Sequence, residues 1–265
     1  MNARSDFFAE RQGVRVLGAF IDAMDWPEAL DTMQAWARMR LPRYVCCCNA
    51  HSLITMRKES PVRAAIEGAH LALPDGAPVA WMMRKLGLPA QRRLSGPDLM
   101  WRYCALAERE GTSIFLYGNT ADVLGALQER LLAAFPRLQI AGMLSPPFRP
   151  LTPGETDAVL DRMRRSGAGV VFVSLGCPKQ EMWMAQNSAR LPAVMVGVGA
   201  AFDYHAGTLR RAPPWMQRAG LEWLHRLCTE PRRLWRRYLV TNFLFVVGAG
   251  RQLMQGTRRA SPAGR

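Results

Sequence analysis

Several patterns that mark common protein classes are missing from this chain of 265 residues. Its six cysteines form no CxxC pair and none has a flanking histidine, which excludes the usual zinc sites and a disulfide framework. The longest uncharged apolar run near the C-terminus, 238–250, is too short for a bilayer span of roughly 20 residues. A GxGxxG fingerprint is also absent, which disfavours a nucleotide-dependent oxidoreductase.

Targeting and metal-binding signals are missing as well. Residues 1–10 carry charges and no apolar core, so we expect no secretory signal and a reduced, cytoplasmic chain. No DxD pair or other metal-ligand spacing occurs, so we predict chemistry that needs no metal and no cofactor. Cys46, Cys47 and Cys48 are then small buried residues of a strand, with Cys47 on the face opposite the other two.

Lysine is scarce, whereas positive charge is abundant. Only three of the 35 basic residues are lysines, and the formal net charge is +14. Arginine suits a fixed, bidentate grip on phosphate or carboxylate, although codon bias explains the same excess. Residues 204–265 hold 12 Arg and 2 Glu, a net of +10, which leaves +4 for the first 203 residues. This asymmetry predicts a polyanionic partner for the C-terminal segment: nucleic acid, anionic lipid or a phosphorylated substrate.

Apolar segments without alternation recur along the chain, separated by helical patterns. Such strands are typical of a parallel sheet covered on both faces. We expect an α/β fold: a Rossmann-like open, mostly parallel sheet with helices on both faces, plus a C-terminal helical appendage that associates with a membrane. The strands are expected at 15–23 (a short pair), 44–49, 70–73, 113–117, 138–142, 169–175 and 193–198. The expected divisions are 1–203 (catalytic domain), 204–255 (basic helical appendage) and 256–265 (disordered tail).

Polar residues follow four of these strands, where parallel strands would bring them to one edge of the sheet. Asn49 and Asp75 follow the first two, and Asp75 stands where a general base could take a proton from an attacking hydroxyl. Taken alone, the Pro-Asp-Gly sequence favours an ordinary turn carboxylate. The turn at Gly118 opens a helix whose N–H groups could receive a phosphate.

The loop after the strand at 169–175 delivers two polar side chains into the first turn of a helix. Lys179 could neutralise a phosphate, and Gln180 could bind a sugar or uracil; a capped helix start with solvent-facing charges is the alternative. Further on, small residues precede Asp203, as expected where backbone approaches a ligand closely.

Aromatic residues alternate with arginines in the basic segment. Arg226, Arg233 and Arg237 are predicted to share a broad helical face with Arg236 beside it, although a solvated basic face is the simpler explanation. An amphipathic set of five residues nevertheless favours a membrane interface: Trp223, Trp235, Tyr238, Phe243 and Phe245.

Taken together, these segments resemble the WecG/TagA/CpsF glycosyltransferases (glycosyltransferase family 26) over about residues 14–240. The motifs that carry the resemblance are CNAHSL (48–53), LPDGAPVAW (73–81), RLSGPDL (93–99), FLYG (115–118), GCPKQE (176–181), GVGAAFD (197–203) and RAPPWMQRAGLEWLHRL (ending at 227).

The resemblance implies an inverting, metal-independent transferase. It would move a hexose from a UDP-sugar donor to a polyprenyl-diphosphate-linked acceptor in the synthesis of bacterial surface polysaccharide, at the inner face of the cell membrane. Asp75 matches the proposed base. Further positions match pocket residues or appendage arginines proposed to meet the diphosphate: Asn49, Arg93, Gln180, Asp203, Arg226, Arg233 and Arg236. Gly76, Gly118 and Lys179 complete the candidate substrate-binding set.

Some questions stay open at this level. Cys47 stands where many relatives have Thr, which puts a hydroxyl contact there in doubt. The sequence does not identify the donor sugar (an N-acetylmannosamine type or a glucose type), the acceptor sugar or the linkage, and a homo-oligomer is possible. A basic nucleic-acid-binding α/β protein is the alternative function. It is disfavoured because the strand-end motifs lie in the nearly neutral part of the chain, so nucleic acid is not an expected partner.

Overall fold

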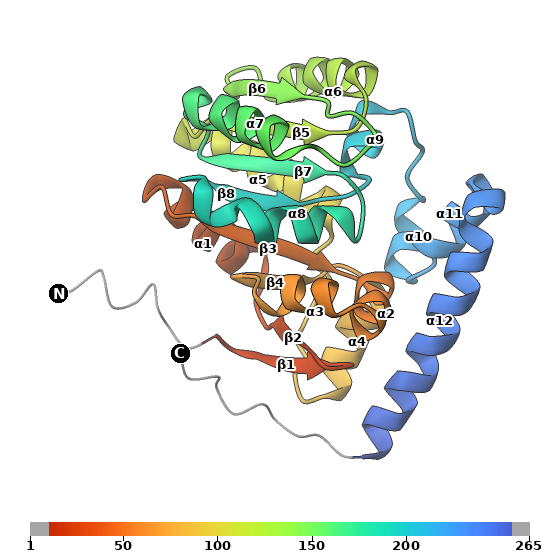
Figure 1. Ribbon diagram of the computed structural model, residues 1–265. Helices are drawn as coiled ribbons and strands as arrows, with labels where there is room; N and C mark the ends of the chain where they lie inside the picture. Colours follow the sequence, from red (N-terminus) through yellow and green to blue (C-terminus); the bar gives the residue numbers. More distant parts are fainter. Residues whose placement is uncertain (1–10, 256–265) are drawn as a thin grey trace.

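The structure is a computed structural model that describes residues 11–255. The tail expected at 256–265 lies outside the described residues. The main sheet has six strands, all parallel, in the order β4-β3-β8-β7-β5-β6 (Figure 1). Its strands are β3 (Arg43–Cys48), β4 (Leu71–Pro74), β5 (Ile114–Gly118), β6 (Ile140–Leu144), β7 (Val170–Ser174) and β8 (Val194–Gly197).

Two apolar cores lie on opposite faces of this sheet. One face is covered by α1 (Trp26–Arg38), α5 (Gly96–Glu110), α6 (Ala121–Ala134) and α9 (Ala201–Ala206). The other is covered by α2 (Ala50–Lys58), α3 (Ser60–Glu67), α7 (Pro153–Ser166) and α8 (Lys179–Asn187), the last followed by a 3₁₀ turn (Ser188–Arg190). The predicted α/β class, with a mostly parallel sheet and helices on both faces, is therefore confirmed.

The three adjacent cysteines show how β3 divides the two cores. Cys46 and Cys48 pack on the α2/α8 side and Cys47 on the α1/α5 side, as the alternation predicted. All three are free and buried. Burial raises the pKa of each thiol, so these side chains are small core residues at neutral pH.

A short antiparallel hairpin, β1 (Gly13–Val16) and β2 (Ala19–Asp22), lies beside the β4 edge, where α4 (Ala77–Lys85) also packs. The buried carboxylate of Asp22 accepts a 2.6 Å hydrogen bond from the backbone N–H of Ala72 in β4. The hairpin is thereby fixed to the sheet by a polar contact as well as by its apolar side chains.

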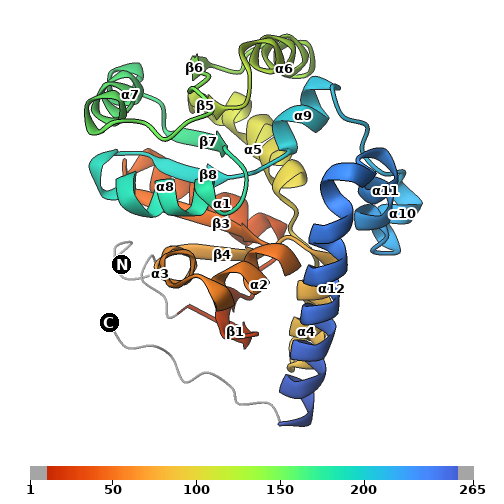
Figure 2. The same cartoon turned by 45° about the vertical axis from the view of Figure 1, so that its right-hand side comes forward.

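From residue 214 onward, the described part of the C-terminal segment is mainly helical. It consists of α10 (Pro214–Arg218), α11 (Glu222–Thr229) and α12 (Pro231–Met254). Figures 1 and 2 show α12 running down one side of the molecule, where it packs against α2. Near its end Gln252 accepts a 2.8 Å hydrogen bond from the N–H of Leu17 and donates one of 2.6 Å to the carbonyl of Arg15, in the β1–β2 hairpin. The last helix is thus joined to the first strands.

One helix was missed by the sequence analysis. The small residues at 197–207 predict a close backbone approach to a ligand. The structure instead forms α9 at 201–206, capped by Gly207, whose φ is +75°. Six residues are too few to show helical periodicity, and α9 is held by packing on α5 and α6. The expected division at residue 203 falls inside this helix.

Candidate active site

A cavity of about 250 Å³ opens where the carboxyl ends of β3, β4, β7 and β8 meet the C-terminal helices. The loops after these four strands form its floor, and α11 and α12 form its outer wall. In open parallel sheets ligands bind at this edge, where the strand order reverses direction. The C-terminal segment therefore covers the expected ligand position.

Asn49 and Asp75 lie together on the floor of the cavity. Asn49 ends β3 and caps α2, with its side-chain oxygen accepting from the N–H groups of His51 and Ser52. Its amide nitrogen is therefore free to face Asp75, at 3.4 Å from Oδ2. Gly76 permits this approach, because a Cβ there would lie 3.2 Å from the Cβ of Asn49.

Asp75 sits among groups that act on its charge in opposite directions. Its Oδ1 accepts a 3.2 Å hydrogen bond from the N–H of Gly96 at the start of α5. Burial raises its pKa above the ordinary value, the guanidinium of Arg93 lowers it and the carboxylate of Glu222 raises it again. The result is a raised pKa, which makes the ionised form a stronger base than an exposed aspartate.

Arginines from the C-terminal helices face this carboxylate across the cavity. Arg226 comes from α11, whereas Arg233 and Arg237 come from α12. The single helical face predicted for the three is wrong, because the chain bends at Glu230 between the helices, but all three line one cavity. Arg236 points elsewhere: its guanidinium lies 5.4 Å from the ring centre of Trp235.

The remaining predicted residues divide into one inside the cavity and three outside its lining. Gln180 lines it, but its carboxamide is engaged within the protein: Oε1 accepts from the N–H of Gly199 at 3.1 Å and Nε2 donates to Glu181. Lys179 is exposed, and Asp203 lies on α9 outside the lining. Gly118 is the last residue of β5, and β7 and β8 lie between β5 and β3. The turn at Gly118 is therefore at the same edge of the sheet but outside the cavity lining.

Five polar residues that line the cavity have a buried nitrogen or oxygen atom with no hydrogen-bond partner among the described residues: His51 (Nδ1), Glu181 (Oε2), Tyr204 (hydroxyl), Arg226 (Nε) and Arg237 (Nε). The sequence pointed to the two arginines, but it assigned no role to His51, Glu181 or Tyr204. Buried polar groups are normally paired, so this concentration indicates a ligand with several polar groups. His51 lies within the CNAHSL motif and Tyr204 directly follows GVGAAFD, but no pattern in the sequence assigned a role to either side chain.

Glu222 is the missed residue that a signal in the sequence could have revealed. The basic segment from residue 204 contains only two acidic residues, Glu222 and Glu230. Both pair with arginines at the cavity: Glu222 with Arg93 at 2.5 Å, and Glu230 with Arg226 and Arg233. The rarity of acidic residues in so basic a segment was the available clue.

A Rossmann-like sheet with a carboxylate and several guanidiniums around one cavity at its strand ends is typical of an enzyme that binds an anionic substrate. The amino-acid sequence identifies the enzyme family. The chain belongs to the WecG/TagA/CpsF family of glycosyl transferases, whose family model matches residues 14–259. It is therefore a glycosyltransferase of cell-surface polysaccharide synthesis.

The described part of the chain contains neither a cluster of metal-ligating side chains nor a helix that could cross a membrane. Within residues 11–255, no group of three or more His, Cys, Asp and Glu side chains is placed to hold a metal ion. Within the same residues, no helix is both long and apolar enough to span a bilayer.

Proposed function

We propose that the protein transfers a hexose from a UDP-sugar to a saccharide linked to polyprenyl diphosphate, with inversion at the anomeric carbon and without a metal ion. One observation carries the proposal: the Asp75 carboxyl group and the guanidiniums of Arg226, Arg233 and Arg237 line the same cavity. A base and a cluster of cations are the two requirements of a displacement in which a hydroxyl attacks and a diphosphate leaves.

The step is a single displacement. The acceptor hydroxyl gives its proton to Asp75 while its oxygen bonds to the anomeric carbon, and the bond from that carbon to the UDP oxygen breaks on the opposite face. The electron pair leaves with UDP, whose added negative charge the arginines stabilise. Positioning of both substrates supplies a further part of the acceleration. Cys47 lies in the wall of the cavity, so a thiol takes the place of the hydroxyl present in many relatives.

Purified protein tests this directly. It would be incubated with a short-chain polyprenyl-diphosphate saccharide and a panel of UDP-sugars, with UDP release measured in buffer and in excess EDTA. We expect one donor class to release UDP only with the acceptor, at the same rate in EDTA, and NMR of the product to show an inverted anomeric centre. Retention of configuration, or loss of turnover in EDTA, contradicts the proposed mechanism.

The outer face of α12 supports a place at the membrane surface. Trp235, Leu239, Phe243 and Val246 follow helical spacing and are 50 to 68 % exposed, while Arg236 is exposed next to Trp235. The opposite face, with Leu234 and Phe245, is buried against the protein. An apolar stripe with adjacent arginines suits an anionic headgroup interface, and we assign the protein to the inner face of the cell membrane on this basis.

Substitution of the apolar stripe tests the membrane assignment. We expect Leu239→Asp with Phe243→Asp to lower partition onto anionic phospholipid vesicles by about tenfold or more, because two apolar side chains lose their place in the interface. Co-sedimentation measures the effect. Phe148→Asp is the matched control, since Phe148 is 85 % exposed but lies in the loop between β6 and α7. Equal partition of the double variant and the control argues against the assignment.

A further inference from the structure

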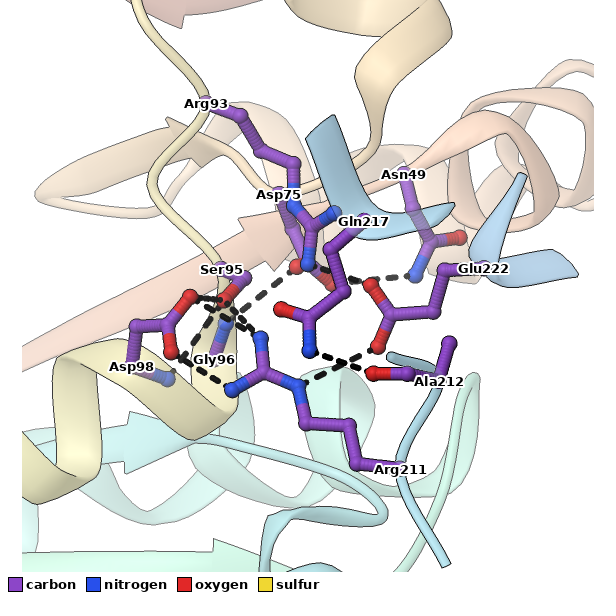
Figure 3. Close-up of polar contacts among 10 residues, drawn as sticks. All are labelled: Asn49, Asp75, Arg93, Ser95, Gly96, Asp98, Arg211, Ala212, Gln217 and Glu222. Carbon is purple, nitrogen blue, oxygen red and sulfur yellow. Dashed lines mark hydrogen bonds and ion pairs between the residues drawn. The ribbon is translucent and has the colours of Figure 1, made fainter. Parts of the chain in front are cut away.

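Glu222, the first residue of α11, reaches from the C-terminal segment into the surroundings of Asp75. Its side chain is 17 % exposed and touches two arginines. Oε2 accepts a 2.5 Å hydrogen bond from Arg93, and Oε1 lies 3.4 Å from Nε of Arg211. Figure 3 shows Glu222 facing the floor of the cavity, with the guanidinium of Arg93 between it and Asp75.

The Arg93 contact gives Glu222 an influence over the base. Arg93 comes from the loop between α4 and α5, and its side chain is 19 % exposed, so its orientation depends on the partners it finds there. The partner given by the structure is Glu222. Arg93 is also the largest charged influence on Asp75. Holding the Arg93 guanidinium on Glu222 therefore keeps it near Asp75 without a direct ion pair between the two.

A second branch of the network fixes the other side of Asp75. Arg211 donates to both oxygens of Asp98, at 2.6 and 2.9 Å, and its Nε faces Glu222. Asp98 in turn accepts from the hydroxyl of Ser95, the residue that caps α5. The N–H of Gly96 at this helix start is the donor to Asp75 (Figure 3). Glu222 thus joins the two groups that hold the base.

Charged groups of both signs surround these carboxylates. Asp75 faces the guanidinium of Arg93, the carboxylate of Glu222, the amide of Asn49 and the thiol of Cys47, whose pKa is raised by burial. The guanidiniums of Arg226, Arg233 and Arg237 face it across the cavity, and the carboxylate of Asp98 is paired with Arg211. Glu222 faces Arg93 and Arg211, with the phenol of Tyr204 also close enough to feel its charge. Removing the negative charge of Glu222 leaves Arg93 with Asp75 as its nearest carboxylate.

We infer that Glu222 is a positioning residue of the active site: it holds the guanidinium of Arg93 beside Asp75 without letting it neutralise that base. The inference deepens the proposed function and rests on the role of Asp75 as the proton acceptor. It also means that the C-terminal segment is part of the catalytic environment as well as a cover over the cavity.

The test is Glu222→Gln, which keeps the shape of the side chain and removes its charge. We expect kcat to fall about tenfold, because Arg93 moves onto Asp75 and weakens it as a base. The acid limb of the rate against pH should move to lower pH, and KM for the UDP-sugar should change less than kcat. Glu155→Gln is the matched control, because it removes the carboxylate of an exposed ion pair with Arg149 that is not part of the cavity lining. This variant should leave kcat and the position of the acid limb unchanged.

A carbon-13 NMR titration of the Asp75 carboxyl measures the same effect without turnover. The Asp75 signal is assigned by its loss in Asp75→Asn, and its midpoint should be lower in Glu222→Gln than in the wild type. If the wild type does not transfer sugar but this midpoint moves, the proposed function fails and the inference about Arg93 and Asp75 stands. If the wild type transfers sugar and neither midpoint nor acid limb moves, the inference is wrong.

A purely structural tie would behave differently. If Glu222 had only a structural role, Glu222→Gln would lower the melting temperature but leave the Asp75 titration midpoint and the acid limb unchanged. That result overturns the inference. If Glu222→Gln does not fold, Arg211→Lys is tested in its place. Lysine keeps the positive charge, but it lacks the planar guanidinium that donates to both oxygens of Asp98 and faces Glu222. It should shift the Asp75 midpoint in the same direction by a smaller amount, and an unchanged midpoint again counts against the inference.

Discussion

Asp75→Asn is expected to lower sugar transfer by about 10²- to 10⁴-fold, the range that a general base contributes. The amide has nearly the shape of the carboxylate and keeps an oxygen for the N–H of Gly96, but it cannot accept the acceptor's proton. UDP release with a matched donor and lipid-linked acceptor measures the loss. Asp122→Asn on α6, where the side chain is exposed, is the control and should retain full activity.

Stability should move in the opposite direction in the same variant. Because burial raises the pKa of Asp75 in the folded protein, folding favours the protonated carboxyl, and this contribution is lost as pH rises through that raised pKa. At neutral pH the ionised group therefore costs stability, which a neutral amide does not. We expect the melting temperature of Asp75→Asn to equal or exceed that of the wild type. Near wild-type turnover in such a folded variant would remove Asp75 from the mechanism.

The same pKa sets the pH dependence of the wild-type enzyme. A protonated Asp75 cannot take a proton, so the rate should fall as pH falls through its raised pKa, above the value of about 3.9 for an ordinary aspartate. A profile of kcat/KM against pH measures the limb, because this ratio reports the pKa of the free enzyme. Any residual transfer by Asp75→Asn should show no fall in rate over this pH range. If the acid limb persists in this variant, another group causes it.

Gly118→Ala is expected to have the largest effect on stability. A Cβ at this position would lie 2.3 Å from the carbonyl oxygen of Ser174 in β7, and the φ of +119° is one that alanine rarely adopts. Overpacking and backbone strain each cost about 1–3 kcal/mol, so we expect a loss of about 2–6 kcal/mol in the free energy of unfolding. For a protein of this size that corresponds to roughly 5–15 °C in melting temperature.

Gly125→Ala provides a matched comparison. Gly125 lies inside α6 with open space where its Cβ would be placed, so alanine should leave the melting temperature unchanged or raise it by a few degrees. Differential scanning calorimetry of both variants separates two interpretations of Gly118. If Gly118→Ala keeps the wild-type melting temperature but loses affinity for UDP, the phosphate-binding interpretation is favoured over the packing role.

The sequence predicted the sheet well because each buried strand carries a local signal. Val170–Ser174 is continuously apolar up to its last residue, and helix starts such as Thr152 with Glu155 have their own capping pattern, which the structure shows. Asn49 and Asp75 could be placed for the same reason: a parallel strand ends where its apolar run ends, and all such ends share one edge. These predictions needed only short-range information.

What the sequence could not show was which of these strand ends are neighbours. The strand order places β8 and β7 between β3 and β5, so the turn at Gly118 lies just outside the cavity lining, while the loop at Gly176 after β7 lines it. The bend between α11 and α12 is similarly invisible in a helical projection, which is why one face was predicted for arginines of two helices. Arg236 entered the candidate set through the family resemblance, whereas the structure places Arg237 in the cavity lining. Contacts such as Glu222 with Arg93 join residues 129 positions apart and depend on tertiary packing.

The attachment of α12 to the first hairpin has a consequence for the order in which the protein can become active. On the ribosome, the sheet and the strand ends with Asn49 and Asp75 are complete once β8 has emerged. Arg211, Glu222 and the cavity-lining arginines of α11 and α12 follow last, and Gln252 reaches the hairpin near residue 15 only when almost the whole chain is out. A nascent chain therefore contains Asp75 long before it contains the residues that surround it, so the cavity is complete only when the last helix has docked.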